Sequence, residues 1–519
     1  MVGDDHVRKP RDLGPAGAMI AAMDLDPDAC YRAIQTRDAR FDGRLFVAVR
    51  TTGIYCRPVC PARTPLRRNV TFHATAASAQ EAGYRACLRC RPETSPQLGA
   101  WNGTSSTVSR ALALIEAGAL DDADVETLAE RVGVGGRQLR RLFLQHLGAT
   151  PVGVAQTRRV LLAKQLIHET DLPMAAVALA AGFGSVRRFN ETFQQLYDRP
   201  PAALRRRKAA TAAPGEAICL TLRYRPPYDW DGMLAFLAMR AIPGVESVAD
   251  NTYRRVIALD GAAGTLAVRP LDGDRLSVAV RFPRPSALPR ILARVRGVFD
   301  LSADPVGIGA VLSRDADLAR LVALRPGLRV PGAWDGFELA VRAILGQQIT
   351  VVAARKLAGD LVAAHGEPLA QGWAEPGLTH AFPSAERLAA ADLSAMKMPG
   401  ARIRCLSGMA AAIAADPHLL APNASLTEMV ARLRALPGIG EWTAQYIAMR
   451  QLREPDAFPA ADVALMRALA DADGVRPSAY QLLARGEAWR PWLAYAALHL
   501  WASLADEGAP PVRKVKRAA

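Results

Sequence analysis

Residues 436–444 read Leu-Pro-Gly-Ile-Gly-Glu-Trp-Thr-Ala, and this stretch indicates how the C-terminal part of the chain folds. Gly438 and Gly440 permit a tight turn in which backbone N–H groups at the start of the next helix face outward. Such a helix start attracts anions, because its N–H groups are unpaired and its dipole favours negative charge. The stretch therefore predicts two helices joined by a hairpin, with Gly438 and Gly440 facing a phosphate.

Asp462 follows in the segment Phe458-Pro-Ala-Ala-Asp462, at the head of a helical run. Two interpretations of this residue stay open. An aspartate at a helix start often does no more than cap the helix. A buried carboxylate can instead stabilise a developing positive charge or orient a water molecule. We take Asp462 as the candidate catalytic residue.

Three aromatic residues accompany this aspartate. Trp442 and Tyr446 lie one helical turn apart, and Trp501 follows in a later helical run. Flat bases stack on such rings, and the electron-rich faces attract cations. The three residues predict a pocket for a flat, positively charged ring.

The chain of 519 residues is too long for one hydrophobic core, because single cores stop growing at roughly 250 to 300 residues. Its net charge of +15 favours polyanionic partners, although an arginine-rich composition is also typical of a GC-rich genome. No apolar run reaches the length of a membrane span, and residues 1–11 carry charges of both signs, unlike a signal peptide. We therefore expect several domains in a cytoplasmic protein without a membrane partner.

Four of the seven cysteines form two close pairs, Cys56 with Cys60 and Cys87 with Cys90. Each pair has the spacing that lets two thiolates clamp one tetrahedral cation, and four thiolates without histidine favour Zn²⁺. In a reducing compartment this pattern indicates metal binding rather than disulfides. The spacing alone leaves a purely structural zinc site as the alternative.

The residues around these pairs are Arg-Thr-Thr-Gly-Ile-Tyr-Cys-Arg-Pro-Val-Cys at 50–60 and Cys-Leu-Arg-Cys-Arg-Pro-Glu at 87–93. They closely resemble the N-terminal domain of the Ada adaptive-response regulators. The resemblance implies that Cys56 irreversibly takes a methyl group from a methylated DNA phosphate, while the other three cysteines remain ligands. Zinc holds a sulfur deprotonated, and the thiolate is the nucleophilic form. Methylation removes one negative charge facing the DNA and should tighten binding. The arginines that could contact phosphate, or equally be solvated surface charges, are Arg57, Arg63, Arg67, Arg68, Arg85, Arg89 and Arg91.

Residues 125–144 and 174–196 share one pattern, a short apolar-striped helix, a glycine turn and a second helix. This is the helix-turn-helix pattern. The second copy, which contains Ala-Leu-Ala-Ala-Gly-Phe-Gly-Ser at 178–185, resembles the AraC family of DNA-binding domains over about 104–206. A helical linker bundle is the alternative. The resemblance implies two recognition helices that read promoter DNA in the major groove, through Gly135, Arg137, Gln138 and Arg141 in the first and Ser185, Arg187, Arg188 and Asn190 in the second.

The order of hairpin, Gly- and Pro-bearing loop and aspartate resembles the helix-hairpin-helix DNA glycosylases. Within them the closest resemblance, over residues 218–501, is to the AlkA type, 3-methyladenine-DNA glycosylase II. It implies excision of alkylated bases, with Asp462 near the sugar and Trp442, Tyr446 and Trp501 around a flipped base. An alkylated purine is already a cationic leaving group, so the positive charge on the sugar is what must be stabilised.

Residues 342–349 match the family's helix and loop that enter the minor groove, which implies DNA contacts by Gln347 and Gln348. Gln348 stands where the family places an apolar wedge. Trp442 occupies the position at which lyase members carry a Schiff-base lysine, which favours a monofunctional glycosylase. No cysteine follows Cys405, so the iron–sulfur loop of other branches is not expected.

We predict a multidomain α+β protein with four domains. The first two are a small zinc-binding α/β domain at 24–95 and an all-α AraC-type helix-turn-helix domain at 104–208. The last two are an antiparallel β-sheet domain with helices at 216–299 and an all-α helix-hairpin-helix glycosylase domain at 300–510.

Two functional hypotheses of different class follow. In the first, the chain is a DNA-3-methyladenine glycosylase II joined to a single-turnover acceptor of methyl groups from DNA methylphosphotriesters and to a promoter-binding module. In the second, it is a transcriptional activator whose glycosylase half only binds DNA. The expected cofactor is Zn²⁺. The expected partners of a bacterial, monomeric protein are damaged duplex DNA, promoter DNA and, as a candidate, RNA polymerase.

Overall fold

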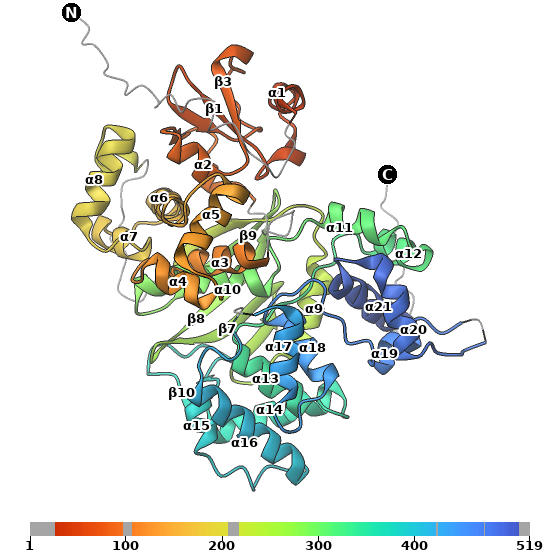
Figure 1. The fold of residues 1–519 in the computed structure, drawn as a ribbon. Coiled ribbons are helices and arrows are strands. Elements are labelled where there is room, and N and C mark those ends of the chain that lie inside the picture. Colours follow the sequence, from red (N-terminus) through yellow and green to blue (C-terminus); the bar gives the residue numbers. More distant parts are fainter. Residues whose placement is uncertain (1–25, 97–105, 206–216, 422–423, 472, 508–519) are drawn as a thin grey trace, which may run out of the picture.

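The computed structural model describes residues 26–96, 106–205, 217–421, 424–471 and 473–507. Along the chain follow a small sheet domain, a helical domain, a larger sheet domain and a second helical domain (Figure 1). The predicted multidomain α+β class is confirmed. The domain boundaries predicted at residues 24, 104, 208, 216 and 510 lie outside the described residues.

Residues 26–96 form a four-stranded sheet of order β3-β1-β2-β4 beside helices α1 (Pro27–Gln35) and α2 (Ala76–Glu81). β1 pairs antiparallel with β2 and with β3, whereas β4 joins β2 in parallel. Because β2 ends at Cys56 and β4 runs parallel to it and ends just before Cys87, the sheet brings the two cysteine pairs to the same end. The strands are β1 (Phe46–Val49), β2 (Ile54–Cys56), β3 (Val70–His73) and β4 (Arg85–Ala86).

Residues 106–205 carry two helix-turn-helix units, α4 with α5 and α7 with α8. Asp124 and Ser185 cap α4 and α8 by accepting backbone N–H groups of the first turn. Gly133 and Gly182 form the turns with φ of 77° and 88°, a backbone region that favours glycine. The helices are α3 (Ser106–Glu116), α4 (Val125–Arg131), α5 (Gly136–Leu147), α6 (Pro151–Glu169), α7 (Met174–Ala180) and α8 (Val186–Tyr197).

The third domain is a five-stranded antiparallel sheet of order β5-β9-β8-β7-β6. Its apolar core continues into the preceding helical domain, since Leu166 of α6 and Phe183 belong to the same buried cluster as Leu220 of β5. The two domains are therefore packed together. The elements are β5 (Ile218–Arg223), α9 (Trp230–Arg240), β6 (Glu246–Ala249), β7 (Thr252–Leu259), β8 (Ala262–Leu271), β9 (Arg275–Arg281) and α10 (Leu288–Val298).

The fourth domain packs its helices around buried residues such as Leu406, Ile447 and Trp489. A two-stranded ribbon, β10 (Glu367–Pro368) with β11 (His380–Ala381), lies within a domain that we predicted to be all-α. The helices are α11 (Pro305–Leu312), α12 (Ala316–Leu324), α13 (Gly336–Leu345), α14 (Val351–His365), α15 (Ala385–Ala389), α16 (Gly400–Ala415), α17 (Leu426–Arg434), α18 (Glu441–Arg450), α19 (Val463–Ala468), α20 (Ala479–Gly486) and α21 (Leu493–Glu507).

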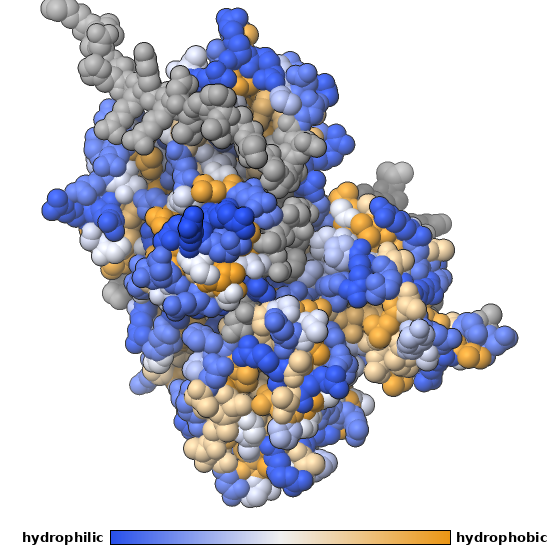
Figure 2. All heavy atoms as spheres, in the orientation of Figure 1, coloured by the Kyte–Doolittle hydropathy of each residue, from blue (hydrophilic) through white to orange (hydrophobic). Residues whose placement is uncertain are grey.

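Hydrophilic residues cover much of the face seen in Figure 2, with apolar residues interspersed over the C-terminal helices. Among the helices of the described residues, none has the length and apolar character needed to cross a bilayer. The apolar residues are instead collected in the cores of the domains.

Candidate active site and metal centre

The carboxylate of Asp462 is held by four hydrogen-bond donors. Oδ1 accepts the backbone N–H groups of Ala464 (2.8 Å) and Leu465 (3.0 Å), which caps α19. The same oxygen accepts the indole N–H of Trp501 at 3.1 Å, and Oδ2 accepts that of Trp442 at 2.6 Å. Capping and a role in the pocket therefore coexist in one residue, and the structure brings Asp462, Trp442 and Trp501 together.

The predicted aromatic residues form one cluster around this carboxylate. The rings of Trp442 and Tyr446 stack with centroids 5.1 Å apart and planes 9° from parallel. Trp501 meets Tyr446 edge to face at 6.5 Å. All three side chains are half-buried, so each keeps some accessible surface. The cluster offers flat faces on which a base could stack beside a fixed negative charge.

Arginines surround the Tyr446 hydroxyl, which sequence reasoning missed. Arg450, one turn further along α18, donates from Nη1 to Tyr446 Oη at 2.7 Å. Burial alone would raise the pKa of Tyr446, but the guanidinium groups of Arg450 and Arg240 outweigh it and the pKa lies below its usual value. Both guanidinium groups lie over the ring of Phe236, at 4.9 and 3.7 Å. The spacing of Tyr446 and Arg450 was a visible signal, whereas Arg240 comes from a different domain.

The hairpin and the loop between α13 and α14 lie against each other. Gly438 adopts φ of 86°, and a Cβ placed on it would meet the Sγ of Cys405 at 2.8 Å, so this position requires glycine. Gly440 is exposed at the start of α18, which has no side-chain cap. The amide of Gln347 donates to the Gly438 carbonyl at 3.1 Å and to the Thr443 hydroxyl at 3.3 Å. Gln347 therefore holds the loop on the hairpin.

Gln348, the next residue, is exposed and has φ of 58°. This left-handed conformation is uncommon for a residue with a Cβ. Its neighbour Gln347 is occupied by protein contacts, so Gln348 is the residue of the pair whose side chain is accessible to DNA.

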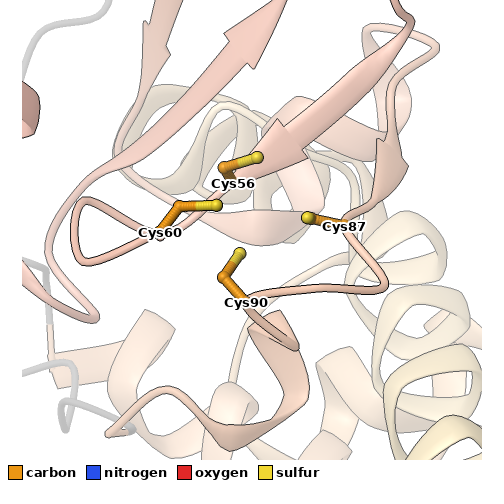
Figure 3. Close-up of side chains that lie close together, drawn as sticks. All are labelled: Cys56, Cys60, Cys87 and Cys90. Atoms are coloured by element: carbon orange, nitrogen blue, oxygen red, sulfur yellow. The ribbon is translucent and has the colours of Figure 1, made fainter. Parts of the chain in front are cut away.

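Four cysteine side chains converge from two strands and the loops that follow them (Figure 3). The sulfurs of Cys56, Cys60, Cys87 and Cys90 all lie within 4.8 Å of one another. A tetrahedral zinc ion with bonds of about 2.3 Å needs sulfurs about 3.8 Å apart, so the donor set and the spacing fit zinc. In the described part of the chain this is the one group of cysteine, histidine and acidic residues so arranged.

The four sulfurs have different surroundings. Cys87 and Cys90 are buried, whereas Cys56 and Cys60 are half-buried. The Arg89 N–H donates to Cys87 Sγ at 3.3 Å, and the Arg57 N–H to Cys90 Sγ at 3.4 Å. Such bonds draw electron density from a sulfur. Among the described residues no backbone N–H donates to Cys56 Sγ, so this sulfur lacks the electron withdrawal found at Cys87 and Cys90.

Arg57, which we expected at the DNA backbone, is instead buried. Its Nε donates to Asp42 at 2.8 Å, and its Nη1 donates to the Thr94 hydroxyl at 2.8 Å and to the Cys90 carbonyl at 3.2 Å. A contact with phosphate would require these bonds to break. The guanidinium therefore holds the cysteine loops in place in this structure.

Two further arginines expected at the phosphate backbone, Arg67 and Arg68, differ in exposure. Arg68 is exposed. Arg67 is half-buried, with its guanidinium over the rings of Tyr31 and Phe72 at 5.8 and 5.4 Å. Arg68 is thus the more accessible charge for a phosphate.

The predicted base-reading side chains of the helix-turn-helix domain are all exposed. Arg137 and Gln138 lie in the first turn of α5, and Arg187 and Arg188 in the first turn of α8. Arg187 pairs with Glu191 on the same helix at 2.8 Å, an exposed pair that costs little to open. Both second helices therefore present polar, hydrogen-bonding side chains at their N-terminal ends.

Three domain families match parts of the chain. They are the metal binding domain of Ada at 29–93, a helix-turn-helix domain at 128–207 and the AlkA N-terminal domain at 219–335. The probable bifunctional transcriptional activator/DNA repair enzyme AlkA of Mycobacterium tuberculosis is 43% identical over 487 residues, covering 93% of this chain and 97% of that protein. DNA-3-methyladenine glycosylase 2 of Escherichia coli is 36% identical over 285 residues, covering 54% of this chain and 96% of that protein. The 3-methyladenine DNA-glycosylase structure from Archaeoglobus fulgidus shares the fold alone, with 20% identity, a TM-score of 0.50 and coverage of 56% of this chain and 99% of that one.

The four-cysteine domain, the helix-turn-helix domain and the aspartate among tryptophans define a class of protein, an Ada-type metal domain joined to an AlkA-type glycosylase fold. The match to the mycobacterial protein extends over nearly the whole of both chains. The chain therefore belongs to the family of bifunctional transcriptional activator/DNA repair enzymes AlkA. The predicted Ada, helix-turn-helix and AlkA resemblances are confirmed, and the four-cysteine metal domain agrees with the expected zinc cofactor.

Proposed function

We propose that this chain is a monofunctional DNA glycosylase that hydrolyses the bond between an alkylated purine and its deoxyribose. The observation that carries the proposal is the Asp462 carboxylate, fixed by two indole N–H groups beside stacked aromatic rings. In the reaction the glycosidic bond breaks, the base leaves as a neutral purine, and a water oxygen binds the sugar carbon while its proton passes to solvent.

The contacts of Asp462 favour an electrostatic role over that of a general base. Three donors converge on Oδ1 and one on Oδ2, so Oδ1 is fully occupied and one lone pair of Oδ2 is left to accept a proton from water. A carboxylate held in this way keeps its place while the sugar becomes positive. Such preorganised charge is typically the largest single contribution to catalysis.

The test is release of free 3-methyladenine and 7-methylguanine from methylated duplex DNA under single-turnover conditions. Asp462→Asn keeps a capping oxygen but removes the charge, and we expect a loss of about 10² to 10³ in rate. Asp335→Asn is the matched control, because Asp335 caps α13 in the same way and its polar contacts, with Phe337, Glu338 and Arg294, include no residue of the aromatic cluster. Release by Asp462→Asn at the rate of the wild type would remove the catalytic assignment.

We further propose that Cys56 is a single-turnover acceptor of methyl groups from DNA methylphosphotriesters. Its half-buried position and the backbone donors at Cys87 and Cys90 support Cys56 over those two sulfurs. The match to the metal binding domain of Ada supports Cys56 over the equally half-buried Cys60. The Cys56 sulfur attacks the methyl carbon, the carbon–oxygen bond breaks, and the phosphate leaves as an ordinary phosphodiester anion. A bound zinc ion supplies the deprotonated state of the sulfur.

Tandem mass spectrometry after incubation with methylated DNA tests this assignment. One methyl group per chain is expected on Cys56, and none in Cys56→Ala. Cys219→Ala, which removes an exposed cysteine outside the cluster, should accept methyl groups as the wild type does. Methylation of Cys56→Ala to the same extent as the wild type would contradict the assignment.

For the DNA interfaces we propose that Gly438, Gly440 and Gln348 face damaged DNA and that Arg137, Gln138, Arg187 and Arg188 read a promoter. The exposure of these residues supports this division. We also propose that a monomer acts in the cytoplasm and that the promoter-bound form contacts RNA polymerase. A chain that binds a promoter but releases no base from methylated DNA would favour the second hypothesis, an activator whose glycosylase half only binds DNA.

A further inference from the structure

A buried residue of the zinc domain, Asp42, connects this domain to the glycosylase half. Its carboxylate accepts hydrogen bonds from Arg57, and its backbone carbonyl accepts one from Nη2 of Arg225 at 2.7 Å. Arg57 directly follows the metal ligand Cys56, and Arg225 lies just after β5. Asp42 therefore joins the neighbour of a cysteine ligand to the first strand of the glycosylase half.

A second contact lies beside the first. Arg44 of the zinc domain forms an ion pair with Asp304, which lies immediately before α11. The same carboxylate is 4.0 Å from Arg225. Nη1 of Arg225 also donates to the Arg40 carbonyl at 3.2 Å. Every hydrogen bond of the Arg225 side chain in the described residues thus reaches into the zinc domain.

From Arg225 the polar contacts continue into the glycosylase half. Its carbonyl accepts a hydrogen bond from Arg329, whose Nη1 donates to the Asp300 carbonyl at 2.6 Å. The Asp300 carboxylate accepts the hydroxyl of Tyr495 at 2.8 Å. Tyr495 belongs to α21, the helix that also carries Trp501 of the pocket. Protein hydrogen bonds therefore lead from the cysteine loops to the helix of the candidate active site.

Helix α6 makes an independent connection between the zinc domain and β5. Glu169 forms an ion pair with Arg91 of the zinc domain at 3.1 Å. It also accepts a hydrogen bond from the backbone N–H of Thr221 in β5 at 2.8 Å. Near it, Lys164 pairs with Glu93 at 2.8 Å, and both side chains are almost wholly buried. The zinc domain thus contacts the region of β5 from two directions.

The groups within each half are buried, and the side chains that cross between the halves are partly buried, with Arg225 11% and Arg44 30% exposed. Asp42 and Arg57 are 6% and 7% exposed, and Arg329 and Asp300 are 2% and 1% exposed. Breaking such a contact leaves a charged group unpaired in a poorly hydrated place, which is strongly unfavourable. Groups linked in one network of this kind lose stability together.

We propose that the four-cysteine centre and the glycosylase half form one cooperative unit, coupled through Asp42, Arg225 and the Arg44–Asp304 pair. Metal bound at the cysteines holds the loop that carries Arg57, which in turn holds Asp42 in place for Arg225. Loss of the metal releases this loop and lowers the stability of the glycosylase half. The proposal rests on zinc binding by the cysteines, and not on the chemistry of Asp462 or Cys56.

Zinc removal from the full chain tests the coupling. Apart from Trp101, every tryptophan lies at or beyond position 230, so tryptophan emission during heating follows the glycosylase half. Treatment with EDTA should lower the midpoint of this transition by about 3 °C or more, and added Zn²⁺ should restore it. The zinc content, measured separately, shows that the metal was bound and removed.

The variant Arg44→Met with Arg225→Met removes the contacts of both side chains and keeps the cysteines. We expect EDTA to shift its glycosylase midpoint by less than about a third of the shift in the wild type. Arg32→Met, a change at an exposed ion pair of the zinc domain, should respond as the wild type does. An unchanged midpoint in wild type after EDTA, or equal shifts in wild type and the double variant, would overturn the proposal.

Hydrogen exchange of the wild type provides the second measurement, should the double variant fail to fold. Removal of zinc should speed exchange in β5 and around Arg225 while α16, far from the zinc domain, keeps its protection (Figure 1). Unchanged exchange in β5 on zinc removal would overturn the proposal as well.

Discussion

The hydrogen bond from Trp442 to Asp462 should contribute directly to catalysis, and Trp442→Phe isolates it. The substitution keeps an aromatic ring beside Tyr446 and removes the N–H that lies 2.6 Å from Oδ2. A hydrogen bond to a charged acceptor contributes about 1.5 to 3 kcal/mol, which corresponds to a loss of roughly 10- to 150-fold in rate. Trp501→Phe removes a longer bond of 3.1 Å to an oxygen with two other donors, and we expect a smaller loss.

Single-turnover release of 7-methylguanine at saturating enzyme is the assay, because it reports the chemical step apart from DNA binding and product release. Trp373→Phe is the matched control, since Trp373 lies near Arg281 and outside the pocket. It should leave the rate unchanged.

A double-mutant cycle separates the hydrogen bond from base stacking. If Trp442 acts through Asp462, Trp442→Phe should have little further effect in the Asp462→Asn background. A loss of the same size in both backgrounds would refute this reasoning and assign the effect to stacking. So would a larger loss for Trp501→Phe than for Trp442→Phe.

Three further outcomes follow from the surroundings of single residues. Lys164→Met leaves the buried Glu93 carboxylate without its ion-pair partner. In denaturant titrations the free energy of unfolding should fall by about 3 to 5 kcal/mol. An unchanged midpoint would contradict the burial of this pair. Burial lowers the pKa of His499 to about 4, so the folded state favours the neutral ring. In the unfolded state the His499 ring takes up a proton near pH 6.5. The free energy of unfolding is therefore highest above pH 6.5, and it falls by about 1.4 kcal/mol for each pH unit between pH 6.5 and the pKa of the folded state. Thermal melts between pH 7 and 4.5 should show this fall in wild type and less of it in His499→Leu; equal slopes would speak against it. Gly438→Ala places a methyl group 2.8 Å from the Cys405 sulfur at a φ of 86°. We expect the free energy of unfolding to fall by roughly 1 to 3 kcal/mol and DNA binding to weaken. Unchanged DNA affinity in a binding titration would disprove this expectation.

Local patterns in the sequence predicted much of the site. The two cysteine pairs and the hairpin at 436–444 are short motifs in which residue type and spacing suffice, because the chemistry needs neighbours along the chain. Trp442 and Tyr446 lie together, as their spacing of one helical turn indicates, but the stacking of their rings on each other was not predicted. From the sequence, capping and catalysis are alternative interpretations of Asp462, and the structure combines the geometry of both in one carboxylate.

What sequence reasoning missed depends on contacts between distant segments. Arg240 reaches the pocket from α9 of the sheet domain, and Arg57 turns inward because Asp42, 15 positions earlier, accepts its guanidinium. Asp42 meets Arg225 across 183 positions, which no local periodicity can reveal. Whether an arginine is exposed depends on such tertiary partners. Its residue type alone therefore does not show whether it contacts DNA or forms a structural ion pair.

Asp462 has two roles in the structure: it caps the start of α19, and it places a negative charge beside the stacked rings. Capping of the helix is by itself sufficient to conserve this aspartate. Its presence in a related sequence therefore does not distinguish an active glycosylase from an inactive one. The indole nitrogens of Trp442 and Trp501 carry that information instead, because a cap has no need of them. A homologue that keeps the aspartate and lacks both indoles is where DNA binding without excision should be sought.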